Sequence, residues 1–239
     1  MEVRDGFIVG IFNYCDGWCE RCAFTSRCRL FADRAEMEAR MDALHAPIVN
    51  APPLPHEAEP EPPAWMRELI EEANEACKQP MSPEECERLR PRVPLAHEPV
   101  NARAEQYGFA TNRWLAAHQP ASEEGPDDPR EVIAWFHFLI GAKVNRALTV
   151  WPDADDELTG SDADGSAKVA LLGIDRSHAA WLTLVERGFL PASEAHPFIA
   201  DLVWLGEALE RIRPRARAFV RPAFDEPDAV AKLLASERV

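Results

Sequence analysis

The sequence predicts an all-α protein, a multi-helix bundle that carries a short cysteine-rich, metal-binding segment at its N-terminus. Apolar residues recur at intervals of three and four through most of the chain after residue 64. Sustained alternation of apolar and polar residues is missing, and 7–14 is the one piece of the sequence with strand character. Four of the six cysteines fall within residues 15–28. These observations predict a helical domain with a local metal site.

The chain divides by composition into three regions. Residues 1–45 are expected to form the cysteine-rich head and a short helix, and 64–239 the helical bundle domain. Between them, 46–63 holds seven prolines with glutamates interspersed. This composition favours extended polyproline conformation and cannot pack a core. We therefore expect a Pro-rich linker or strap there.

Helix boundaries are marked by periodicity and by capping residues. Ser82 and Asp128 each precede a proline and a glutamate, which is typical of a capped helix start. The helix at 131–150 is so apolar that burial on most sides is expected. The spacing predicts helices over 30–45, 63–78, a short stretch after Ser82, 99–118, 131–150, 165–187 and 194–213.

The cysteines of the head have the spacing C-x3-C-x2-C-x5-C, formed by Cys15, Cys19, Cys22 and Cys28. Thiolates are the preferred ligands of both zinc and iron–sulfur clusters, and these short spacings let one loop surround one centre. Three cysteines in one tight run with a fourth nearby favour an iron–sulfur cluster, possibly 4Fe-4S, over zinc. Buried or redox-active thiols are the third interpretation. We expect Arg21, Arg27 and Arg29 to offset the thiolate charge, and Trp18 and Phe24 to exclude water.

The first three cysteines resemble the cluster motif of the radical S-adenosylmethionine enzymes. That resemblance covers eight residues and implies a barrel of alternating strands and helices, a pattern that this sequence lacks. Cys28 would occupy the iron position that the family leaves open for its cofactor. The other two cysteines, Cys77 and Cys86, are expected in the core, with a redox pair as the alternative.

A second candidate site lies in the bundle and consists of His137, Asp175 and His178. Asp175-Arg176-Ser177-His178 resembles the Glu-x-x-His motif of ferritin-like di-iron proteins, which implies carboxylate and histidine ligands. A second motif is missing, so Glu131, Glu207 and Glu210 would have to complete the set. Hydrogen-bonded structural histidines are the favoured interpretation.

Two charged segments have plain structural explanations. The acidic segment 153–164 is expected to be a solvated loop in which Asp162 or Asp164 caps the next helix. The basic cluster is expected to pair with acidic side chains, with an anion or partner site as the alternative. It consists of Arg211, Arg213, Arg215, Arg217 and Arg221.

Charge and hydropathy limit the class of function. With 26 basic and 41 acidic residues, the formal charge of −15 disfavours nonspecific binding to nucleic acid. No apolar run is long enough to span a membrane and no signal peptide is evident, so a cytoplasmic protein is expected. We expect an iron–sulfur protein of electron transfer or redox sensing with a possible redox or protein partner. A noncatalytic interaction protein with structural zinc and a bundle enzyme using the histidine and carboxylate site are the alternatives.

Overall fold

The computed structural model describes residues 2–45, 67, 68, 70, 71, 82–118, 128–152 and 156–236. It is mainly helical, as predicted, and these residues form seven α-helices and one short hairpin. Two compact units are present, one comprising 1–33 with 91–239 and the other 34–90. The Pro-rich region 46–63, Cys77 and nearly all of the predicted helix 63–78 lie outside the described residues.

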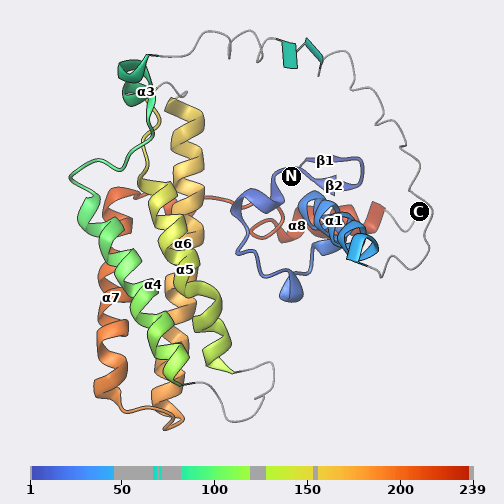
Figure 1. Cartoon of the computed structure of the whole chain (residues 1–239). Coiled ribbons are helices and arrows are strands. Elements are labelled where there is room, and N and C mark those ends of the chain that lie inside the picture. Colours follow the sequence, from blue (N-terminus) through green and yellow to red (C-terminus); the bar gives the residue numbers. More distant parts are fainter. Residues whose placement is uncertain are drawn as a thin grey trace. The chain divides into compact units, whose positions relative to one another are not determined.

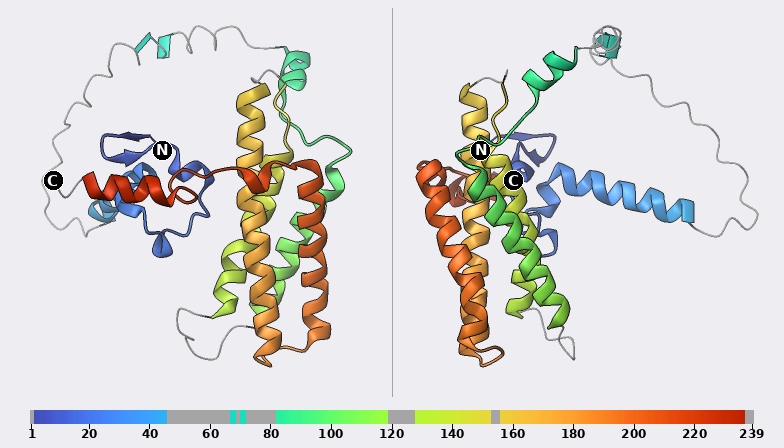
Figure 2. Two further views of the ribbon diagram at one scale, coloured as in Figure 1. Left: turned by 180° about the vertical axis from the view of Figure 1, so that it is seen from behind. Right: turned by 60° about the vertical axis from the view of Figure 1, so that its left-hand side comes forward.

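The first unit is built on a bundle of four helices. These are α4 (Glu98–Ala117), α5 (Pro129–Leu148), α6 (Asp156–Glu186) and α7 (Ala192–Ile212). Consecutive helices run in opposite directions and pack side by side, and α7 returns to contact α4 (Figures 1 and 2). This is the up-and-down arrangement of a four-helix bundle.

The two predicted helix caps are confirmed. Ser82 precedes α3 (Pro83–Leu89), and its hydroxyl accepts a hydrogen bond from the Glu85 amide at 3.1 Å. Asp128 precedes α5, and its carboxylate accepts from the Arg130 amide at 2.9 Å. Each side chain satisfies an amide that has no partner within its own helix.

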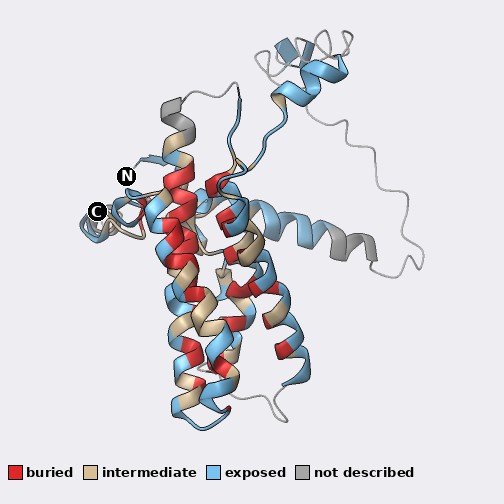
Figure 3. Cartoon of the chain, turned by 90° about the vertical axis from the view of Figure 1, so that its left-hand side faces the viewer, coloured by how far each residue is buried: buried red, intermediate tan, exposed pale blue. Residues whose placement is uncertain are grey.

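The bundle core is filled by aromatic and aliphatic side chains from all four helices, and the buried faces of the helices turn toward one another (Figure 3). Tyr107, Phe136 and Trp181 are completely buried, and the Trp181 indole donates to the Tyr107 hydroxyl at 3.2 Å. α5 is buried or half-buried on most sides, as expected, and is exposed along one stripe that includes Phe138, which is 47% exposed. The helix has one core face and one solvent face.

Phe136 and Phe138 provide a matched pair for testing this core. We expect Phe136→Ala to lower the free energy of unfolding by about 3–5 kcal/mol, because it removes a fully buried ring and leaves a cavity. Phe138→Ala should cost less, about 1–2 kcal/mol, because about half of its ring is exposed and the rest packs on Phe109 of α4. Urea unfolding followed by circular dichroism measures both values. Equal losses would contradict the assignment of the two faces of α5.

The acidic residues from Asp156 onward belong to α6. The loop predicted over 153–164 is therefore wrong for these residues. Asp162 accepts two hydrogen bonds from Arg146 at 3.0 and 3.1 Å, and Asp164 forms an ion pair with Arg215 at 3.2 Å. These carboxylates are thus accommodated within the helix by cations from neighbouring segments. Neither residue caps the helix.

The N- and C-terminal segments of this unit pack against each other (Figure 1). Strands β1 (Val3–Arg4) and β2 (Phe7–Ile8) form an antiparallel hairpin. The short 3-10 helices η1 (Ile11–Tyr14), η2 (Cys19–Arg21) and η3 (Thr25–Arg27) follow before α1 (Arg29–His45). After α7 come η4 (Ala216–Ala218) and α8 (Pro227–Ser236), a helix that we did not predict. Their shared small core contains Ile8, Ile11 and Ala223, with Phe24, Cys28, Phe224 and Val230 packed around it.

The second unit, 34–90, contains most of α1 and the whole of α3. Arg34 with Glu38 and Arg40 with Glu36 form ion pairs one helical turn apart along α1. Cys86 on α3 is exposed, so its predicted place in a core is wrong. None of the helices in the described parts of either unit is long and apolar enough to cross a membrane.

Candidate metal centre

The four cysteines of the head converge on one small cavity. Cys15, Cys19, Cys22 and Cys28 all line it, and each is a half-buried free thiol. The remaining walls are largely apolar and include Ile11, Phe12, Phe31 and Phe224. The cavity measures about 20 Å³, enough for one atom-sized guest. A single loop thus places four cysteines around one largely apolar cavity.

Contacts with the bundle hold the loop on both sides of Cys15. The Tyr14 ring meets the Phe219 ring edge-on at 4.7 Å. On the other side, the Asp16 carbonyl accepts from the Trp135 indole at 2.8 Å, and its carboxylate accepts from Arg176 at 2.5 Å. The position of Cys15 is therefore set by α5, by α6 and by the segment after α7.

Trp18 fixes the next part of the loop, directly before Cys19. Its ring stacks on that of Trp135 with centroids 5.1 Å apart and planes 11° apart. The Arg21 guanidinium lies 4.0 Å from the Trp18 ring centroid and donates to Glu131 at 2.6 Å. Stacked aromatic pairs and cation–π contacts of this kind each contribute about 1 kcal/mol. The 3-10 turn that bears Cys19 is thereby attached to α5.

Two of the cysteine sulfurs take part in hydrogen bonds with nearby backbone groups. The Phe24 amide donates to the Cys22 sulfur at 3.4 Å, and the Cys15 thiol donates to the Phe12 carbonyl at 3.4 Å. An amide directed at sulfur stabilises negative charge there, and such bonds tune cluster potentials in iron–sulfur proteins. The Phe24 amide thus lies where it would hydrogen-bond to Cys22 if this sulfur held a metal.

Burial affects the pKa of two of the four thiols and of a nearby lysine. It raises the pKa of the Cys15 and Cys19 thiols, and for Cys19 the neighbouring cysteines raise the pKa further. Lys143 on α5 is beside Cys15, and its ammonium donates to the Asn13 carbonyl at 3.3 Å. Burial lowers the pKa of Lys143. A bound cation would have to displace protons from these thiols.

The three arginines expected to offset the thiolate charge have partners of their own. Arg21 and Arg29 form ion pairs with Glu131 and Asp33, and the Arg27 guanidinium donates to the Gly6 carbonyl. Lys143 places a cation beside Cys15, and sequence reasoning missed it. This lysine gives no local signal in the sequence, because it belongs to a distant helix and only the packing of α5 on the head brings it there.

The four thiols are not arranged as the ligands of a metal ion. No three His, Cys, Asp or Glu side chains in the described parts of the chain are grouped so that they could hold a metal ion. The cysteines line one cavity, but their side chains would have to turn toward a common point to bind one. The donor types and their enclosure fit a metal centre, whereas the present side-chain positions are not those of a bound state.

The second candidate site comes together only in part. His137 lies on α5, where its Nδ1 is 2.6 Å from the Ala134 carbonyl and burial lowers its pKa. Asp175 binds Arg217 through both carboxylate oxygens. Asp175 and His178 line the same groove between α6 and α7 as Glu207 and Glu210, and His137 is not part of that groove. The remaining proposed ligand, Glu131, is paired with Arg21 at the start of α5.

Comparison with known proteins gives no further indication of the function. No protein-family model, curated protein or solved structure matches this chain. The functional argument therefore depends on the site itself.

Proposed function

We propose that this chain is a metalloprotein in which Cys15, Cys19, Cys22 and Cys28 hold an iron–sulfur cluster, possibly 4Fe-4S, that serves electron transfer or redox sensing. One observation carries the proposal: four free thiols from a single loop line the same largely apolar cavity. Free thiols persist in a reducing compartment, which suits a cytoplasmic protein with a redox or protein partner.

The chain's own residues suit such a centre in three ways. The Phe24 amide directs a hydrogen bond at the Cys22 sulfur, and Lys143 places a cation beside Cys15. Phe12 and Phe224 line the cavity, and their rings would limit the access of water to a bound centre. When bound, a cluster supplies one-electron exchange at a potential that depends on these same factors.

Structural zinc is the second candidate, and the size of the cavity favours it. A space of about 20 Å³ accommodates one ion without expansion, whereas a cluster requires the loop to open. Four thiolates around one zinc would attach the head firmly to the bundle, because Asp16 and Trp18 within the same loop contact α5 and α6.

Elemental analysis after anaerobic purification distinguishes these proposals. A cluster predicts iron with acid-labile sulfide and a broad brown absorption, while structural zinc predicts one zinc per chain and no colour. Protein purified without either metal, and unable to bind them when they are supplied under reducing conditions, would contradict both proposals.

A further inference from the structure

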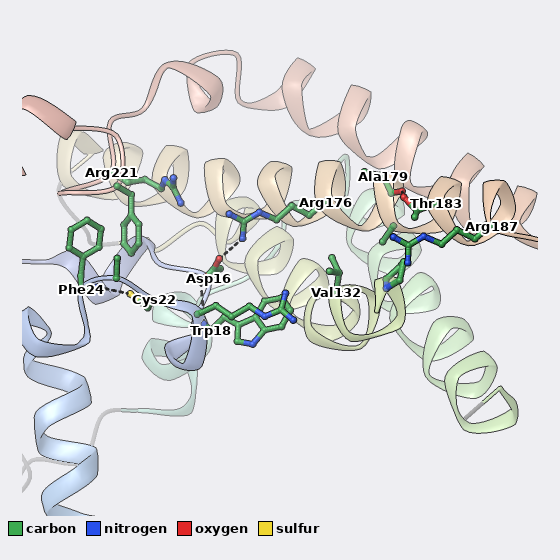
Figure 4. Close-up of a pocket in the computed structure, with 15 residues that line it drawn as sticks. Asp16, Trp18, Cys22, Phe24, Val132, Arg176, Ala179, Thr183, Arg187 and Arg221 are labelled. Atoms are coloured by element: carbon green, nitrogen blue, oxygen red, sulfur yellow. Dashed lines mark hydrogen bonds and ion pairs between the residues drawn. The ribbon is translucent and has the colours of Figure 1, made fainter. Parts of the chain in front are cut away.

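A second and much larger pocket lies next to the cysteine cavity. It measures about 670 Å³ and is bounded by the head, α5, α6 and the segment after η4 (Figure 4). Pockets that bind small organic molecules have volumes of about 300–1,000 Å³. Its size is therefore that of a small-molecule site.

The charge of this pocket is opposite to that of the whole protein. Four arginines line it, namely Arg21, Arg176, Arg187 and Arg221, together with a single carboxylate, that of Asp16. The complete chain has a formal charge of −15. A concentration of guanidinium groups in such a chain favours an anionic ligand.

Three of these arginines are held in place by the fold. The guanidinium groups of Arg21, Arg176 and Arg221 lie over aromatic rings, with distances to the ring centroids of 4.0, 5.5 and 5.0 Å. Each also has a carboxylate partner, which neutralises part of its charge. A guanidinium has five N–H donors, so one carboxylate partner does not use them all.

Arg187 differs from the other three. It is exposed just after the end of α6 and has no ion-pair partner among the residues that the structure describes. Arg176 and Arg187 are separated by three helical turns, about 16 Å along the axis. Between them, Val132, Ala179, Ala180 and Thr183 form a largely apolar stretch of the wall. The pocket thus combines cationic ends with a largely apolar middle.

We propose that this pocket binds a small organic anion, a phosphate or carboxylate joined to an apolar group. Guanidinium groups bind both kinds of anion with two parallel hydrogen bonds, and the alanines and Val132 would contact the apolar part. Cys22, Asp16, Trp18 and Phe224 line both this pocket and the cysteine cavity, so the ligand would lie directly against the candidate metal centre. The proposal goes beyond the metal centre and does not depend on it.

Three probes with similar apolar bodies and different charges test this site: phenyl phosphate, benzoate and benzylamine. Ligand-observed NMR on the full chain should detect binding of at least one of the two anions and none of benzylamine. Competition between phenyl phosphate and benzoate then shows whether the site prefers phosphate or carboxylate. Equal binding of benzylamine, or no binding of either anion at millimolar concentration, would overturn the proposal.

A charge-matched pair of variants locates the binding. Arg187→Ala should weaken anion binding roughly tenfold, because it removes a charged hydrogen-bond donor. Arg113→Ala removes the same charge from an exposed position on α4 outside the pocket, and should leave binding unchanged. Equal effects of the two variants would contradict the site. Metal content measured on the same samples separates a failure of this proposal from a failure of the metal centre.

Discussion

Cys22→Ser is expected to abolish metal binding at the proposed centre while leaving the bundle folded. Cys22 lines the cysteine cavity and is the sulfur to which the Phe24 amide donates. Serine keeps the approximate size of the side chain but removes the soft thiolate that iron and zinc prefer. Iron or zinc content should fall from stoichiometric to near zero, with loss of any visible absorption, while helical circular dichroism persists.

Cys86→Ser is the matched control for this experiment. Cys86 is exposed on α3, outside the cysteine cavity, and the substitution makes the same chemical change. Its metal content should equal that of the unaltered protein. If both variants retained the metal, or if both lost it, the assignment of Cys22 as a ligand would be wrong.

The bundle could be predicted because its signals are local. Ser82 and Asp128 cap the helices that they were expected to cap, and the mainly helical fold follows from spacings of three and four. The start of α6 could not be predicted in this way. Asp162 and Asp164 suggested a solvated loop, but Arg146 and Arg215 accommodate them within a helix, and these ion pairs form only in the folded chain.

The cysteine spacing predicted a common site, and all four thiols do line one cavity. The surroundings of that cavity come from residues far away in the sequence, including Lys143 on α5 and Phe224 after η4. The same holds for the arginine pocket, whose members come from the head, α6 and the C-terminal segment. Arg221 was one of a cluster expected to pair with acidic groups, and it does pair with Asp225 while also lining the pocket.

Gly165→Ala is expected to loosen the head from the bundle. A Cβ atom at this position of α6 would overlap the Tyr14 ring and lie 2.9 Å from the Phe219 ring. Those rings pack against each other, so neither can move away without disturbing the segment that carries Cys15. Overpacking of this kind costs about 1–3 kcal/mol. We expect faster amide exchange in 11–19 and a metal affinity reduced about tenfold, as measured by chelator competition.

Gly160→Ala on the same helix is the control, because a Cβ atom there meets nothing within 4 Å. It should preserve metal affinity and exchange rates, and replacing glycine by alanine within a helix should raise stability by about 0.5–1 kcal/mol. If Gly165→Ala behaved like Gly160→Ala, the contact of Tyr14 with α6 would not be what positions Cys15. If instead the head loosened while metal affinity stayed unchanged, the cysteines would form their site without support from the bundle.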